Sequence, residues 1–261
     1  MCGVIPLNEF RELTAYVENT EVFKEKRVRV RGKANMTLLP DFFLVEVYNM
    51  EDEDRALLET KKELKIIAKD KAVLACGEVE DIYDKQEDMN IRSVISLSDG
   101  QSFWETRIDR TVGAGACFSQ TIRQIIQNVQ MGSYLADDPR FPRAQTFCGR
   151  LADIISGIAK GVDARAFISD NVLHVVQKGR SEIIVKITEE DLLEEPRTAS
   201  GVVILRTDVK AWPVGMLHEF RVKQYRLVSQ EVNADNFSGP WQTELMLADE
   251  SMLDKGGMGG G

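Results

Sequence analysis

Two histidines, His174 and His218, are the only imidazole groups that this 261-residue sequence offers for acid–base or metal chemistry. Each lies in a predicted strand without a second histidine or a cysteine at metal-ligand spacing. No Gly-x-Ser-x-Gly motif and no acid–histidine–nucleophile set supports hydrolysis. We therefore expect both histidines to be structural, and we expect no catalytic residue and no metal site.

The thiols and carboxylates also lack a reactive arrangement. The cysteines are scattered and form no Cys-x-x-Cys pair, so we expect neither a zinc site nor a disulfide framework. They are Cys2, Cys76, Cys117 and Cys148. Carboxylates gather in two polar runs, 81–88 and 189–195, for which solvated turns are the expected structure.

One glycine-containing segment is similar to a dinucleotide-binding fingerprint. Residues 113–118 read GAGACF, and they follow a predicted strand and open a predicted helix. The position of the third glycine is occupied by Phe118, and the preceding elements are short strands rather than a parallel βαβ unit. We therefore expect no cofactor here, and we interpret the segment as a flexible hinge between a β region and a helical region.

Composition indicates a globular chain. Hydrophobic residues make up 43% and charged residues 29%, and 33 basic against 42 acidic residues give a net charge of −9. Such an acidic chain is poorly suited to binding nucleic-acid phosphates. No apolar run has the length of a membrane span, and the first ten residues lack the features of a signal peptide. We therefore expect no membrane association, and we expect synthesis in a reducing cytoplasm.

The elements that must position these residues are mostly strands. Residues 27–31 alternate between arginine and valine, which predicts a strand with Val28 and Val30 facing a core. A helix over 51–59 is predicted to begin at an Asn49 cap. Further strands are expected over 42–48, 64–68, 72–79, 91–97 and 102–108.

The middle of the sequence changes to helical periodicity. Apolar residues at helical spacing predict helices over 118–129, capped by Ser119, and over 150–160. A loop is expected over 131–145 and a hairpin over 164–176. Later strands are predicted over 201–205, 217–223, 225–231 and 241–247. In the last strand Trp241, Thr243, Leu245 and Leu247 share one face.

The order of these motifs resembles that of phage tail baseplate hub proteins, the tail-tube-like hubs of contractile or related tails. Residues 212–247 contain a glycine-bearing turn, a Tyr-x-x-Val strand, a polar turn and a Trp-containing strand, as the closing module of that family does. Residues 40–50 are similar to the family's strand with an asparagine-capped helix, and 98–100 to its strand-end turn. The helix and hairpin over 150–176 resemble its small insert.

This resemblance implies a mainly β fold with a small α/β middle segment, in the α+β class, with two tail-tube-like β-barrel modules. The expected domains are an N-terminal β-barrel module over 1–112, a helical and hairpin insert over 113–179, a C-terminal β-barrel module over 180–250 and a disordered glycine-rich tail over 251–261. With two modules per chain, three chains would mimic the sixfold symmetry of the tail tube.

The resemblance also implies a non-enzymatic structural role. The chain would form a homotrimeric hub ring in the virion tail baseplate, with the tail tube protein, the central spike protein and the tape measure protein as partners. DNA would pass through the ring without specific binding, and acidic residues facing the bore would repel it. The alternatives are a tail-tip cell-wall-degrading enzyme and a monomeric β-rich ligand-binding module.

Five residues are the structural or interface candidates. Val28 and Val30 are expected on an edge strand that completes a sheet in the next chain, or else on an ordinary intramolecular strand with its arginines in water. Trp241, Thr243 and Leu245 are expected on the inward face of the closing strand.

Overall fold

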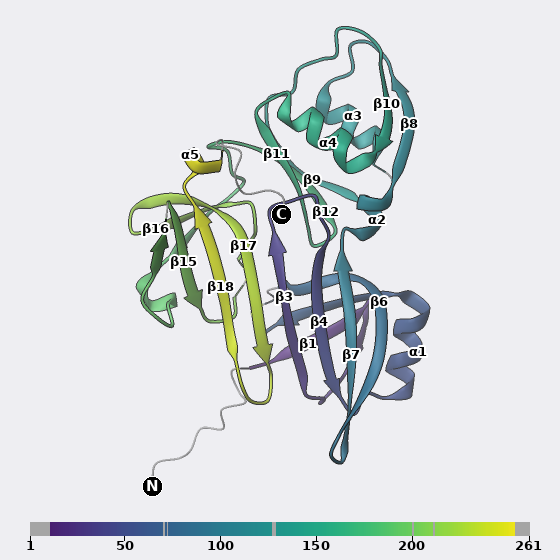
Figure 1. Ribbon diagram of the computed structural model, residues 1–261, viewed down its shortest axis with the longest axis vertical. Coiled ribbons are helices and arrows are strands. Elements are labelled where there is room, and N and C mark those ends of the chain that lie inside the picture. Colours follow the sequence, from purple (N-terminus) through teal and green to yellow (C-terminus); the bar gives the residue numbers. More distant parts are fainter. Residues whose placement is uncertain are drawn as a thin grey trace.

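The computed structural model describes residues 11–253, except residues 70, 72, 127, 128, 200 and 211. Strands dominate, so the predicted mainly β fold class is confirmed. One 13-stranded sheet runs through two β modules, and an α/β insert lies at one end of them (Figure 1).

The N-terminal module surrounds a core of alternating aliphatic side chains. Val28, Val30, Val45 and Val47 all point into this core and are almost completely buried, because side chains of a strand alternate between its two faces. The elements are β1 (Leu13–Val17), β2 (Thr20–Val22), β3 (Val28–Asn35), β4 (Asp41–Tyr48), α1 (Asp52–Lys61), β5 (Glu63–Ala68), β6 (Val73–Glu87) and β7 (Asn90–Asp99).

The C-terminal module has its own core, in which Leu205, Leu227, Leu245 and Leu247 are fully buried. Its elements are β13 (Ile184–Ile187), a 3-10 turn (Glu189–Asp191), β14 (Arg197–Ala199), β15 (Val202–Thr207), β16 (Leu217–Phe220), β17 (Lys223–Asp235), β18 (Trp241–Ala248) and α5 (Glu250–Leu253).

The two modules repeat one arrangement within a continuous sheet. The strand order is β14-β15-β18-β17-β3-β4-β7-β6-β5-β1-β2, and antiparallel pairing of β17 with β3 joins the modules. In each module a hairpin (β3–β4 or β14–β15) is followed by a longer hairpin (β6–β7 or β17–β18) whose first strand carries a register shift. Strands β3-β4-β7-β6 therefore correspond to β14-β15-β18-β17.

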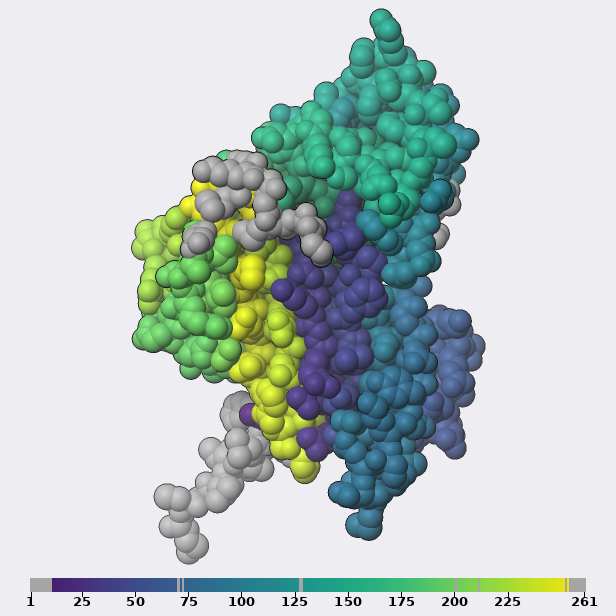
Figure 2. Space-filling model, in the orientation of Figure 1, coloured from purple at the N-terminus to yellow at the C-terminus, as the bar shows by residue number. Residues whose placement is uncertain are grey.

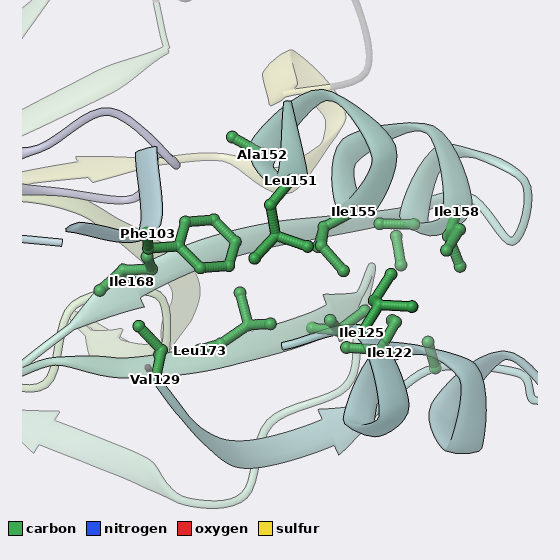
Figure 3. Packing of buried hydrophobic residues seen from close by; sticks show 14 of the residues in the cluster. Phe103, Ile122, Ile125, Val129, Leu151, Ala152, Ile155, Ile158, Ile168 and Leu173 are labelled. Atoms are coloured by element: carbon green, nitrogen blue, oxygen red, sulfur yellow. The ribbon is translucent and has the colours of Figure 1, made fainter. Parts of the chain in front are cut away.

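The insert packs two helices against short sheets (Figure 3). Its core contains Phe103, Ile122, Ile125, Leu151 and Ile155, all nearly inaccessible to solvent. The elements are α2 (Gln101–Glu105), β8 (Arg107–Val112), α3 (Phe118–Ile125), β9 (Gln130–Leu135), β10 (Gln145–Arg150), α4 (Leu151–Lys160), β11 (Ala164–Ser169) and β12 (Val172–Gln177).

The insert begins earlier than the sequence predicted. Strand β8 pairs with β10, so this unit starts at Gln101 rather than at residue 113. The predicted strand over 102–108 is wrong in its first half, where a helical turn places Phe103 in the insert core. The predicted loop over 131–145 is wrong over β9, which pairs in parallel with β12. The segment 113–118 lies within the insert and is not a hinge between domains.

Both predicted helix caps are also wrong. The cap position of α1 is Glu51, while the Asn49 side chain accepts a hydrogen bond from the Ile91 amide at 3.0 Å. Helix α3 has Cys117 at its cap position, and the Asp138 carboxylate accepts hydrogen bonds from both the amide and the hydroxyl of Ser119.

The predicted tail over 251–261 is partly ordered. Its first residues belong to α5, which is fixed by a hydrogen bond from Arg226 Nε to Glu250 Oε1 at 2.6 Å. Residues 254–261 lie outside the described residues.

Candidate assembly surface

The continuous sheet that runs through both modules is called the joined sheet here. One of its faces is left uncovered by other elements. Figure 2 views this open face, with β18, β17, β3, β4 and β7 side by side. Because strand side chains alternate, Phe42 and Leu44 project from β4 on this face, opposite the buried Phe43 and Val45. Phe42 is 61% exposed and Leu44 is 39% exposed.

Phe42 has a shallow hollow on each side. One is lined by Leu44, Ser96 and Leu97, and the other by Lys33, Glu231 and Asn233. Gly32 borders both, and a Cβ atom at Gly32 would lie 2.3 Å from the Phe43 ring. Glycine is therefore required for the close contact between β3 and β4 at this point.

The same face holds a buried carboxylate among three arginines. Glu46 is 3% exposed, and its Oε1 atom accepts a hydrogen bond from Arg31 Nη2 at 2.6 Å. Arg92 Nη1 lies 3.6 Å from Oε1, and Arg29 Nη1 lies 3.9 Å from Oε2. This cluster links β3, β4 and β7, and Arg92 is also paired with Glu87, at 2.8 Å between Nη2 and Oε1.

The joined sheet has two unpaired edges that border this face. Within the described residues, β6 pairs with β5 only up to Glu78, and from residue 80 to 87 it pairs with β7 alone. At the other end, β14 pairs only with β15 among the residues that the structure describes. Unpaired strand edges expose N–H and C=O groups that can bind another strand.

The edge position predicted for Val28 and Val30 is wrong. Strand β3 is central in the sheet, with β17 on one side and β4 on the other, and both valines are buried. The prediction failed because β17 lies about two hundred residues away in the sequence; Ala234, for example, is the register partner of Val30.

The closing strand β18 has the predicted alternation. Thr243 and Leu245 are fully buried, and Leu247 is buried with them. Trp241 at the start of the strand is only half-buried, and it packs against a small cluster that includes Val232 and Ala234.

Both histidines contact packed groups. His174 stacks on Phe167 at 5.1 Å between ring centroids, and its Nδ1 atom accepts a hydrogen bond from the Ser133 amide. His218 is fully buried with its Nδ1 atom 3.2 Å from the Met216 carbonyl oxygen, and burial lowers its pKa to about 4. Both imidazoles are placed as packing groups.

The remaining candidate groups are dispersed. In the part of the chain that the structure describes, Cys76, Cys117 and Cys148 are free thiols, and Cys2 lies outside it. No group of three or more histidine, cysteine or acidic side chains in that part is arranged to hold a metal ion. Among the described helices, none is long and apolar enough to cross a membrane.

Sequence reasoning missed Glu46 and the two sheet edges. A signal for Glu46 exists, since it is the one acid in the apolar run 42–48 and an antiparallel hairpin places it opposite Arg29. The edges carry no such local signal, because they depend on pairing between distant segments.

No family model matches the sequence, and no curated protein matches it. Solved structures do match the fold. The 43 kDa tail protein of prophage MuSo2 from Shewanella oneidensis has a TM-score of 0.65 at 8% identity, over 94% of this chain and 99% of that one. The tail protein from Neisseria meningitidis MC58 has a TM-score of 0.60 at 10% identity, over 91% and 96%.

A third similar structure comes from Escherichia coli. It is a component of the type VI secretion system with structural similarity to the T4 bacteriophage tail proteins gp27 and gp5. Its TM-score is 0.60 at 6% identity, over 91% of this chain and 76% of that one. The chain therefore has the fold of these tail and secretion-system proteins, which agrees with the fold that the order of its sequence motifs implied.

Proposed function

We propose that three copies of this chain form a hub ring in a phage or phage-like tail baseplate, with the open face of the joined sheet lining the bore. The single observation that carries the proposal is the repeat of β3-β4-β7-β6 as β14-β15-β18-β17 in one continuous sheet. The similar solved structures of tail proteins support it.

The repeat supplies a model for the contact between copies. Every neighbouring pair along this part of the sheet is antiparallel, so strands four places apart run in the same direction. Inside the chain, β17 pairs with β3. Their counterparts are β6, whose outer edge is unpaired from residue 80 to 87, and β14, whose outer edge is unpaired in the described residues. Pairing β6 of one copy with β14 of the next would therefore repeat the internal junction. Such head-to-tail contacts generate a ring when the rotation between neighbouring copies closes.

A ring of three copies would enclose a wide bore. Eight strands per chain, from β14 to β6, give 3 × 8 = 24 strands. At about 4.8 Å between strands, the backbone diameter is about 37 Å for upright strands. It rises to about 48 Å at a tilt of about 40°. Side chains would narrow this opening but leave a wide bore.

The surface that would line the bore mixes both charge signs. Arg29, Arg31 and Arg92 surround Glu46, and Arg206 donates to Glu244 at 3.2 Å. Paired arginines leave no continuous basic track for phosphates, which suits passage of DNA without specific binding. The sequence led us to consider a bore lined by acidic residues, whereas the bore proposed here is lined by both acidic and basic residues.

The proposed role is structural rather than enzymatic, at the virion tail baseplate after synthesis in the host cytoplasm. The proposed partners are the tail tube, the central spike and the tape measure protein. A peptidoglycan lysis assay separates this role from a cell-wall-degrading enzyme, since the ring protein should give no turnover.

Mass measurement across concentration and salt, combined with negative-stain imaging, tests the ring. Both edge segments carry more acids than bases, so the two edges should repel each other at low ionic strength. Salt screens this repulsion, and the trimer fraction should therefore rise between about 20 and 200 mM salt. The acids are Glu80, Asp81, Asp84 and Glu87 on β6, and Glu194 and Glu195 before β14, against Lys85 and Arg197. A stable twofold dimer, or a monomer under all conditions including added spike protein, would refute the proposal.

A further inference from the structure

The insert differs in charge from the rest of the chain. From Gln101 to Gln177 the sequence has 8 basic and 7 acidic residues, a net charge of +1. The remainder has 25 basic and 35 acidic residues, a net charge of −10. Seven of the eight basic residues of the insert are arginines, and the single lysine is Lys160, whereas the remainder has 11 arginines and 14 lysines. The insert is therefore a basic, arginine-rich unit at one end of an acidic chain (Figure 1).

Most arginines of the insert also lack the carboxylate partners that arginines have elsewhere. Outside the insert, ten of the eleven arginines form an ion pair with a carboxylate, and the eleventh, Arg11, donates to the Gly239 carbonyl oxygen. Within the insert, Arg150 alone has such a partner among the residues that the structure describes. The other six are exposed and form no ion pair in that part of the chain: Arg107, Arg110, Arg123, Arg140, Arg143 and Arg165.

The ribbon formed by β8 and β10 brings two guanidinium groups together. Arg107 is the register partner of Arg150, and both side chains are exposed. Like charges directly opposite each other on neighbouring strands repel. Arg150 lies 4.9 Å from the centre of the half-buried Trp104 ring and 3.3 Å from Asp153, so its charge has local partners. Arg107 has no such partner, and an added carboxylate would relieve the repulsion between the two arginines.

The loop between β9 and β10 extends this basic surface. Its two acids are already engaged inside the chain, because Asp138 accepts from the Ser119 amide at 2.8 Å and Asp137 accepts from Arg180 Nη2 at 2.6 Å. Arg143 follows in the same loop, two residues before β10 begins. It therefore lies beyond the end of the ribbon opposite to Arg107, at a separation of about 20 Å along the strands.

Partly exposed aromatic rings accompany the arginines. Phe141 stacks on Phe118 at 4.5 Å between ring centres and meets Phe147 edge-on at 5.8 Å, and none of the three is fully buried. Arginine and aromatic residues are enriched at protein–protein interfaces, where lysine is depleted. Proteins that bind phosphate backbones use lysine as well as arginine. The composition of the insert therefore favours a protein partner over a nucleic acid.

We propose that the β8–β10 ribbon and the adjoining loop, through Arg107, Arg150 and Arg143, bind a separate protein whose surface is rich in carboxylates. Arginine suits this partner because its planar guanidinium group binds a carboxylate through two parallel hydrogen bonds. In the proposed ring the acidic edges of β6 and β14 are covered by neighbouring copies, so the choice of a separate protein over a second copy rests on the proposed function.

Binding of fluorescent polyglutamate to the full chain, measured by anisotropy, tests the basic surface. A chain of negative net charge should bind this probe only through a local basic surface. We expect binding at about 20 mM salt that weakens at least about tenfold at about 200 mM. Arg107→Gln/Arg143→Gln should weaken binding at low salt at least about fivefold. The matched control Lys62→Gln/Lys186→Gln removes the same charge from two exposed lysines outside the insert and should change it less than about twofold.

The outcomes separate this proposal from its alternatives. Absence of binding by the parent chain, or equal weakening by the two double variants when their melting temperatures match that of the parent, would overturn it. Tighter binding of a DNA duplex of equal charge would overturn the assignment to a protein. A trimer lost only in the arginine variant would make a second copy the partner and would also overturn it. Absence of rings in the parent chain would instead overturn the proposed hub function, while polyglutamate binding would still test the basic surface.

Discussion

Arg27 Nη2 donates a hydrogen bond to Asp235 Oδ2 at 2.7 Å, joining the residue just before β3 in the N-terminal module to the end of β17 in the C-terminal module. Asp235 is 1% exposed. Burial opposes its ionisation, but hydrogen bonds from Arg27 and from the amides of Phe237 and Ser238 outweigh burial and hold its pKa below the ordinary value. This ion pair helps to fix the angle between the modules.

Replacing Arg27 should therefore weaken the junction. Arg27→Met keeps an apolar stem over Tyr48 but leaves the buried Asp235 carboxylate without its charged partner, so we expect a loss of about 2–3 kcal/mol in unfolding free energy. Urea titration measures the loss. Lys24→Met, at an exposed surface pair, is the matched control and should change stability by less than about 0.5 kcal/mol. Equal effects of the two variants would contradict the assigned role of Arg27.

Two alanine variants of the closing strand β18 should differ in how much unfolding free energy they lose. Leu245→Ala removes a fully buried side chain and should lower the unfolding free energy by about 3–4 kcal/mol. Trp241→Ala should lower it by only about 2 kcal/mol, below the usual range for a buried tryptophan, because Trp241 is half-buried. Denaturant titration of both variants tests the order, and a larger loss for Trp241→Ala would show that this ring is buried in an assembly.

Local sequence patterns predicted which side chains of a strand or helix face a core. The alternation of valine and arginine predicted the inward faces of β3, and the periodicity of α4 placed Ile155 in a core. Patterns failed where the partner is distant in sequence. Strand β3 is central only because β17 pairs with it, and Ser119 is bound by Asp138 from a following loop instead of acting as a cap.

The candidate assembly surface also depends on contacts between segments that are distant in the sequence. The exposure of Phe42 and Leu44 was not predicted, because residues 42–45 are all apolar and only Glu46 distinguishes their face from the other. The free edge of β6 has no local signal, since β6 is long enough to pair with β5 in its first half and with β7 in its second.

The contact between the N-terminal module and the insert should respond to pH. The Asn171 amide donates to Asp99 Oδ1 at 2.7 Å, and burial with the adjacent charge of Asp170 raises the pKa of Asp99 to about 7. An unfolded aspartate titrates near pH 3.9, so the folded state binds more protons between about pH 4 and 7. Stability should therefore fall as pH rises through that interval.

Asp99→Asn should remove part of this dependence. The amide oxygen can still accept from Asn171, and the variant should be more stable than the parent at pH 8 and closer to it at pH 4. Some dependence should remain, because burial raises the pKa of Asp41 on β4 to about 6. Melting temperatures across pH 4–8 measure the effect. Asp109→Asn on the exposed face of β8 is the control, and an identical response from it would contradict the role of Asp99.

The edge of β14 allows a direct test of the ring contact. Strands β14 and β2 each have three residues and lie at opposite ends of the whole sheet, but only β14 borders the proposed contact between copies. A proline cannot donate a hydrogen bond to an added strand. Thr198→Pro on β14 should therefore reduce the trimer fraction several-fold in mass measurements, while Glu21→Pro on β2 should leave it unchanged. Melting temperatures of the monomers show whether both variants remain folded. Loss of trimer in Glu21→Pro with a normal trimer in Thr198→Pro would place the contact at the other end of the sheet.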